Sequence, residues 1–273
     1  MSESTERARW RWHVAVGLIS AAVLAPVAAG MAGVVLPALG YLPALGNREM
    51  GLSVLGAFFQ APGISRSIAV SGLCALVATA LSVALTAGIL AASFQTRALW
   101  LAERLLAPIL SVPHAAAALG FVFLFAPSGF LLRLASPWAT GLEVPPDVVL
   151  LNDPWGWSLI AALTVKETPF LFLMALAAMG QVRADERAAV ARTLGYGRIH
   201  AFVHGVWPLV YRQMRLPVLA VLAFAASVVD MALILGPTRP ATLSVRILGW
   251  LQSPDLDGWL LGSAGALVMM ALV

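Results

Sequence analysis

Residues 181–215 read QVRADERAAVARTLGYGRIHAFVHGVWPLVYRQMR and form a polar segment between two long apolar runs. In the whole chain of 273 residues, hydrophobic residues make up 60% and charged residues only 11%, whereas soluble domains carry about 25% charged residues. The polar segment is therefore the best surface on which this chain could meet a soluble partner. It holds six of the sixteen arginines: Arg183, Arg187, Arg192, Arg198, Arg212 and Arg215.

The composition predicts an all-α polytopic membrane protein, because the mean hydropathy of +0.89 fits no soluble class. The net charge of +4 could indicate a nucleic-acid partner. Basic loops are, however, what orients a membrane protein in the bilayer, so we expect a lipid bilayer and no nucleic acid as partner.

Apolar runs long enough to cross a membrane need about 20 residues. Six such runs predict about six transmembrane helices, with the last still apolar at Val273. Because that last run is short, we expect either a separate short subunit or the first half of a longer polypeptide. Of these two, we slightly prefer the first half of a longer polypeptide. We divide the chain into 1–60, with the first helix and an outer loop, and a core of 61–273 with a cytoplasmic loop at 181–212. The runs are 13–36, 67–93, 105–126, 157–180, 213–236 and 258–273.

The arginines predict the orientation. The N-terminus, the loop after the second run and the polar segment carry eleven of them, and the opposite loops carry five. The positive-inside rule then places the polar segment and the N-terminus, which begins with Arg7, Arg9 and Arg11, in the cytoplasm. A cleaved signal peptide is the alternative for the first run, but this run is long enough to span.

Residues for chemistry are scarce. The only lysine, Lys166, precedes Glu167, so the chain has no phosphate-binding loop and any ATP would be bound by a partner subunit. The single Cys74 excludes a disulfide framework. His200 and His204 are spaced as a metal pair but lack a third ligand nearby, so we expect neither a metal site nor an enzyme.

Within the polar segment, residues 185–194 predict a short helix, with acids in its first turn, Arg192 in its last turn and Gly195 at its end. Gly197 allows a second turn before a short segment that stops at Pro208. Two short helices joined by a glycine hinge would form either a rigid docking knob or a surface linker whose arginines grip lipid phosphates.

The spacing of this segment resembles the cytoplasmic signature of the permeases of binding-protein-dependent ABC importers. That signature reads Glu-Ala-Ala, three residues, Gly, nine residues, Ile, one residue, Leu-Pro. Aligning Gly195 with the signature glycine puts Pro208 on its proline, whereas Ala189, Gly205 and Trp207 depart from it. The similarity extends to 66–67, 166–170 and 230–237, covers roughly residues 60–273, and is closest to the fused thiamine- and ferric-iron-type permeases.

The resemblance implies a type I importer permease fold of the inner membrane, in which this loop docks into a groove of a cytoplasmic ATP-binding subunit. It also implies a second permease half, fused or separate, and a periplasmic substrate-binding protein. No cofactor is expected in this chain. Carried over by alignment, the residues that would meet the ATPase subunit are Ala189, Ala191, Arg192, Leu194, Gly195, Tyr196 and Pro208.

Three charges fall inside the apolar runs: Lys166, Glu167 and Asp230. Charged groups at membrane depth are costly and usually face a cavity or each other. They would either line a translocation path or join two spans through a Lys166–Asp230 ion pair. An ion-coupled secondary transporter that titrates Glu167 and Asp230 is the alternative function.

Overall fold

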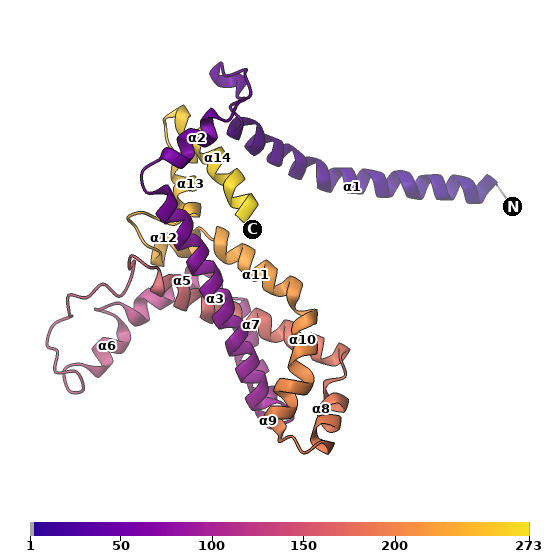
Figure 1. Ribbon diagram of the computed structural model, residues 1–273, viewed down its shortest axis with the longest axis vertical. Coiled ribbons are helices and arrows are strands. Elements are labelled where there is room, and N and C mark those ends of the chain that lie inside the picture. Colours follow the sequence, from indigo (N-terminus) through magenta and orange to yellow (C-terminus); the bar gives the residue numbers. More distant parts are fainter. Residues whose placement is uncertain (1–2, 273) are drawn as a thin grey trace. The chain divides into compact units, whose positions relative to one another are not determined.

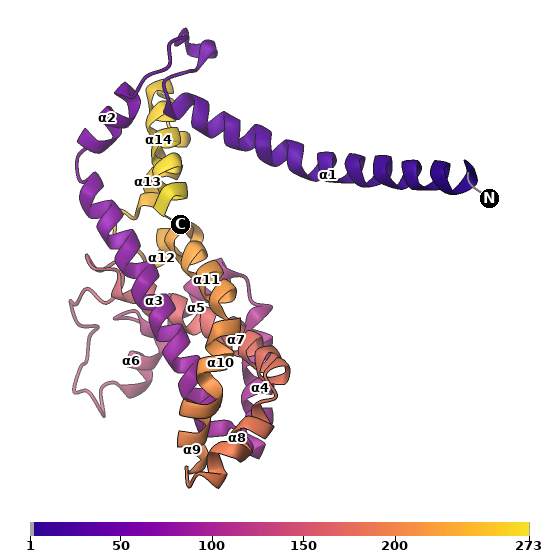
Figure 2. The ribbon, with the colours of Figure 1, turned by 45° about the vertical axis from the view of Figure 1, so that its right-hand side comes forward.

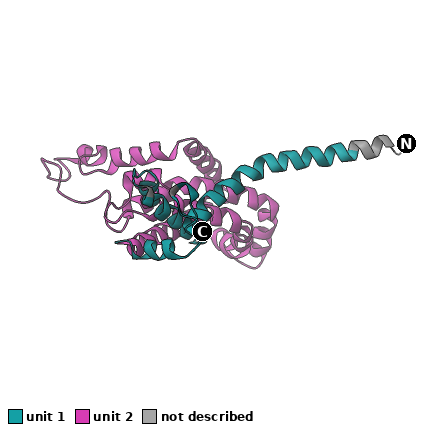
Figure 3. Cartoon of the chain, turned by 90° about the horizontal axis from the view of Figure 1, so that it is seen from above, with its two compact units in different colours: residues 1–62, 247–272 teal, residues 63–246, 273 magenta. Residues whose placement is uncertain are grey.

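The computed structural model describes residues 3–272, apart from the side chains of residues 3–8, 45 and 256. The side chain of Arg7 and the terminal Val273 therefore lie outside the described residues. The chain divides into two compact units, residues 1–62 with 247–272 and residues 63–246 (Figure 3).

The regular structure of residues 3–272 is helical apart from two isolated β-bridges. Within the described part of the chain, four helices are long and apolar enough to span a membrane, and a bent pair makes a fifth candidate. The predicted all-α polytopic fold is confirmed. The candidate spans are Arg9–Ala38, Ile64–Ser93, His114–Ala135, Trp157–Gln181 and the pair Arg198–Gln213 with Arg215–Ser227, and the shorter apolar helix Asp257–Leu272 covers the sixth run.

The first unit contains α1 (Glu3–Ala38), α2 (Ser53–Gln60), most of α13 (Leu243–Leu251) and α14 (Leu256–Leu272). Phe58 is fully buried and meets Trp250 edge to face, with ring centroids 5.9 Å apart. A Cβ at Gly265 would lie 2.8 Å from Ile247 and 3.1 Å from the Phe58 ring. Glycine at this position therefore lets α14 pack closely against its neighbours.

The second unit is built around α3 (Ile64–Ser93) and α7 (Trp157–Gln181), which pack along each other (Figures 1 and 2). Small polar residues on the shared face tie the helices together, as where the Ser82 hydroxyl donates to the Thr164 carbonyl at 3.3 Å. Around this pair lie α4 (Arg97–Leu110), α5 (His114–Phe125), α11 (Arg215–Ser227) and α12 (Asp230–Leu235), with α6 (Phe130–Ala135) beyond α5.

Two of the expected spans are broken. Run 105–126 divides into α4 and α5 at residues 111–113, where Pro113 disfavours a helical Val112. Run 213–236 divides into α11 and α12 at Val228, whose carbonyl is taken by the Ser244 hydroxyl at 2.7 Å. Hydropathy alone reports apolar length and does not show such breaks.

Pro169 lies inside α7, beside Lys166 and Glu167, without breaking the helix. Helix α7 runs through it from Trp157 to Gln181. The flanking residues Thr168 and Leu171 are buried, so packing on both sides of the proline outweighs one lost backbone hydrogen bond.

Candidate functional site

The predicted helix at 185–194 is present as α8 (Ala184–Thr193). Asp185 and Glu186 lie in its first turn and Arg192 in its last, so the charges match the helix dipole. Arg183 and Glu186 form an exposed ion pair at 3.6 Å, which contributes little stability.

Gly195 ends α8 in the left-handed conformation, with φ +91. The Gly195 amide donates to the Arg192 carbonyl at 3.0 Å, and the Tyr196 amide donates to the Ala191 carbonyl at 3.3 Å. These two bonds are the Schellman pattern of helix ends. A side chain at Gly195 would meet open space, so the backbone conformation, and not crowding, requires glycine there.

The second helix of the polar segment does not stop at Pro208 as expected. It begins with α9 (Arg198–His200), widens to a π-helix, η2 (Ala201–Val206), and continues as α10 (Trp207–Gln213). Pro208 falls in the first turn of α10, where a missing N–H is tolerated. Gly197 has an ordinary extended conformation, φ −67 and ψ 164, so the turn needs glycine only at Gly195.

Small residues allow α8 and η2 to touch. A Cβ at Gly205 would lie 3.3 Å from the Ala191 Cβ and 3.7 Å from the Arg187 carbonyl oxygen. Ala184 and Ala188 are buried on the same helix. The isoleucine that the importer signature places at 205 would not fit this crossing without displacing α8.

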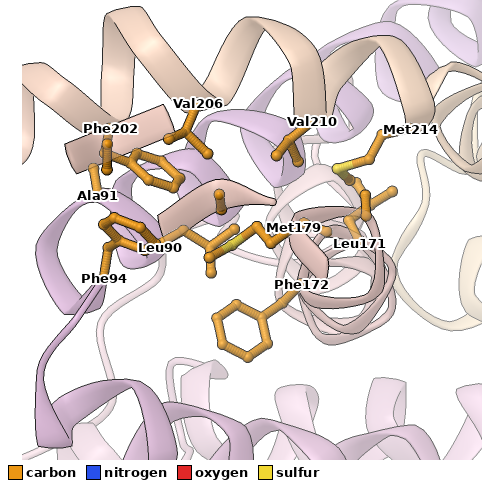
Figure 4. Close-up of a cluster of buried hydrophobic side chains, with 14 of the residues drawn as sticks. Leu90, Ala91, Phe94, Leu171, Phe172, Met179, Phe202, Val206, Val210 and Met214 are labelled. Carbon is orange, nitrogen blue, oxygen red and sulfur yellow. The ribbon is translucent and has the colours of Figure 1, made fainter. Parts of the chain in front are cut away.

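The segment is anchored to the end of α3. The Phe94 and Phe202 rings lie 5.1 Å apart and face one another in Figure 4. The Arg198 guanidinium donates to the Phe94 carbonyl at 3.1 Å, and the Gln95 amide donates to the Asp185 carboxylate at 2.8 Å. Because α7 ends only three residues before α8 begins, the segment is held by both central helices of the unit.

A hollow of about 350 Å³, which we call the α8 hollow, opens between α8 and η2. Its apolar rim is exposed, with Leu194 at 74% and Val190 at 63%. Exposed apolar surface bordered by polar residues is a feature of protein interaction sites. The hollow is lined by Arg187, Val190, Ala191, Leu194, Tyr196, His204 and Gly205.

Three of the residues expected at an ATPase contact therefore meet in one surface: Ala191, Leu194 and Tyr196. Gly195 lies between the last two and shapes the turn. Ala189, Arg192 and Pro208 are exposed but do not line the hollow.

Sequence reasoning missed the contributions of Val190 and His204. The ring of His204 stacks on Tyr196 at 6.1 Å. The spacing of His200 and His204 indicated that the two side chains share one helix face. It did not indicate which residue of another segment, here Tyr196, that face contacts.

The charges inside the apolar runs do not pair as expected. The Lys166 ammonium donates to the carbonyls of Ile109 at 3.1 Å and Leu110 at 3.4 Å, at the end of α4. The expected Lys166–Asp230 ion pair is therefore wrong: an Asp230 oxygen accepts instead from the Met231 amide at 2.9 Å.

Glu167 faces the beginning of the next helix, because its Oε1 lies 3.4 Å from Nε2 of His114, the first residue of α5. Lysine thus meets the negative end of α4 and glutamate the positive end of α5, which matches the helix dipoles on both sides of the break. The same Glu167 oxygen is buried and has no hydrogen bond within the described structure.

The beginning of α7 is capped by Asp153. Its carboxylate accepts the backbone N–H groups of Trp155, Trp157 and Ser158, at 3.0–3.1 Å, and the Ser158 hydroxyl at 3.2 Å. Burial alone would raise the pKa of this carboxyl. The hydrogen bonds that it accepts lower the pKa by more than burial raises it, so the pKa lies below the ordinary value.

Comparison with known proteins gives one informative relative. No protein-family model matches the chain. The Escherichia coli K12 protein named inner membrane ABC transporter permease protein YnjC is 33% identical over 165 residues. This chain is similar to an ABC transporter permease. The match covers 60% of the chain but 30% of the relative, which is about twice as long.

Proposed function

We propose that this chain is the transmembrane permease subunit of an ABC importer in a bacterial inner membrane, and that the α8 hollow docks a cytoplasmic ATP-binding subunit. The exposed apolar rim of that hollow, in a segment spaced like the importer signature, is the observation that carries the proposal. Similarity to a protein named as an inner membrane ABC transporter permease supports the same assignment.

Movement of the docked subunit would reach the membrane through rigid contacts. Helix α8 is tied to the turn that follows α3 through the Gln95–Asp185 hydrogen bond. The adjoining π-helix is tied to the same end of α3 through the Phe94–Phe202 ring contact. A displacement of α8 would therefore move α3 and α7 together. In this way ATP hydrolysis in the partner subunit would change the conformation of the membrane-spanning helices.

The translocation path in this proposal runs beside the α4–α5 break, where Lys166 and Glu167 hold the two helix ends. Asp230 starts α12 and is exposed, which supports a place on the same path. Half-helix ends at membrane depth supply oriented partial charges to a passing solute. A second permease half, fused or separate, would complete the path, and a periplasmic binding protein would deliver the substrate.

Exposed leucines on α11, among them Leu216 and Leu219, support contact with that second half or with lipid. The length of the E. coli relative agrees with a two-half arrangement. We further propose that this permease is most similar to the fused thiamine- and ferric-iron-type systems, which its region 216–250 resembles.

The experiment is purification of the chain from native membranes with its bound partners. We expect a subunit with a phosphate-binding loop to co-elute, and the eluate to hydrolyse ATP. The variant Leu194→Asp, which puts a charge on the exposed apolar rim, should lose that subunit.

Val144→Asp is the matched control. Val144 is equally exposed, at 73%, but lies in the loop between α6 and α7, on the predicted outer side, and this variant should retain the subunit. A chain that purifies alone and takes up protons in a manner abolished by Glu167→Gln would instead favour the secondary transporter.

A further inference from the structure

A second hollow, of about 450 Å³, lies where the ends of α7 and α10 meet the beginning of α11. Its polar lining consists only of cations and amides: Arg187, Arg212 and Arg215 with Gln181 and Gln213. We call it the basic hollow. Three guanidinium groups around one depression, with no acid lining it, form a strongly positive site.

These arginines are not used by the fold. Neither Arg212 nor Arg215 has a carboxylate within salt-bridge distance among the side chains that the structure describes. Arg187 uses only its Nε in a hydrogen bond, which it donates to the Val182 carbonyl at 3.0 Å.

The two acids at the start of α8 are engaged elsewhere. Glu186 pairs with Arg183, and Asp185 accepts from Gln95. The basic hollow therefore keeps most of its donors free for an external anion.

The position of the hollow indicates where that anion comes from. Gln181 is the last residue of α7 and of its candidate span, whereas Arg215, the first residue of α11, lies at the bend of the paired helices and near the start of the apolar run 213–236. Helices α10 and α11 bend by 63° at this point, and Met214 at the bend is buried. In the predicted orientation, Gln181 and Arg215 lie at the depth of the lipid headgroups of the cytoplasmic leaflet.

We propose that the basic hollow binds the phosphate of an anionic lipid headgroup from that leaflet. One guanidinium group can donate two parallel hydrogen bonds to the oxygens of a phosphate, and glutamine amides add uncharged donors. The proposal does not depend on the proposed transport function.

Arg187 also lines the α8 hollow. A bound headgroup would therefore hold α8 against the α10–α11 bend and prepare the α8 hollow for its partner.

The test titrates the purified chain in detergent with short-chain phosphatidylglycerol and counts bound lipid by native mass spectrometry. We expect the double variant Arg212→Gln with Arg215→Gln to raise the apparent Kd by about 30-fold, because each arginine near anionic lipid contributes about fivefold. If the double variant does not fold, the single variant Arg212→Gln replaces it, and we expect its apparent Kd for the lipid to rise by about fivefold.

The matched control is Arg97→Gln with Arg192→Gln. It removes two exposed charges from the same predicted side, neither of which lines the hollow, and should bind the lipid like the wild type. Equal binding by the Arg212/Arg215 double variant and the wild type would overturn the proposal. Displacement of the lipid by an equal concentration of inorganic phosphate would also overturn it, because it would assign the hollow to a soluble anion.

Discussion

At the scale of single residues, Gly195 and Gly197 look equivalent in the sequence and differ in the structure. Gly195 has a left-handed backbone, whereas Gly197 does not. We expect Gly195→Ala to weaken the end of α8 by about 1–2 kcal/mol, because a Cβ is strained at this φ. Hydrogen exchange of the Tyr196 amide should then quicken about five- to thirtyfold, while Gly197→Ala leaves it unchanged. An unchanged Tyr196 amide in Gly195→Ala would contradict the Schellman assignment.

Asp153 makes stability depend on pH. Its folded-state pKa is depressed, so its contribution is present above the unfolded pKa of about 3.9 and is lost as the pH falls through the folded value. We expect Asp153→Asn to lower stability at neutral pH by about 1 kcal/mol, because the variant loses the negative charge at the positive end of α7 and one of the two oxygens that accept backbone N–H groups there.

The difference between wild type and Asp153→Asn should shrink below about pH 4. Far-UV circular dichroism can follow thermal unfolding over this pH range, because the regular structure of the described residues is helical. A constant difference from pH 7 to pH 3 would show that the carboxylate charge is not what caps α7.

At the scale of helices, the crossing of α8 and η2 depends on Gly205. Gly205→Ile should destabilise the segment by about 1–3 kcal/mol, because its Cβ alone would meet Ala191 at 3.3 Å. Gly197→Ile adds the same side chain in open space and is the control. Equal thermal midpoints of the two variants would contradict the crossing.

The α4–α5 break depends on Lys166. Lys166→Met leaves the Ile109 and Leu110 carbonyls without their donor and should cost about 1–3 kcal/mol. The charge swap Lys166→Asp with Asp230→Lys should not recover this stability, because the two residues serve different helix ends. Recovery by the swap, measured as the thermal midpoint, would restore the ion-pair interpretation.

Local patterns in the sequence predicted local structure. The acids, Arg192 and Gly195 predicted α8 and its end, because caps and dipole matches involve neighbours in the chain. The π-helix before Pro208 and the approach of Gly205 to Ala191 depend on packing between segments. The same holds for Lys166, whose partners lie more than fifty residues away.

At the scale of the molecule, the chain is an all-α polytopic membrane protein whose polar segment lies on the two central helices of its second unit. Apolar runs predicted its helical class, since composition and hydropathy are properties of the whole chain. Residues 247–272 belong to the same compact unit as the N-terminal residues. Apolar runs could not predict this grouping, because it depends on contacts between helices that are distant in the sequence.

The central claim is that the α8 hollow is the surface which an ATP-binding subunit contacts. The most direct measurement places the photoreactive amino acid benzoylphenylalanine at position 194 and cross-links the chain in native membranes. We expect a cross-linked product that contains a subunit with a phosphate-binding loop, and no such product from position 144. A position-194 probe that labels only lipid, or labels the same partner as position 144, would contradict it.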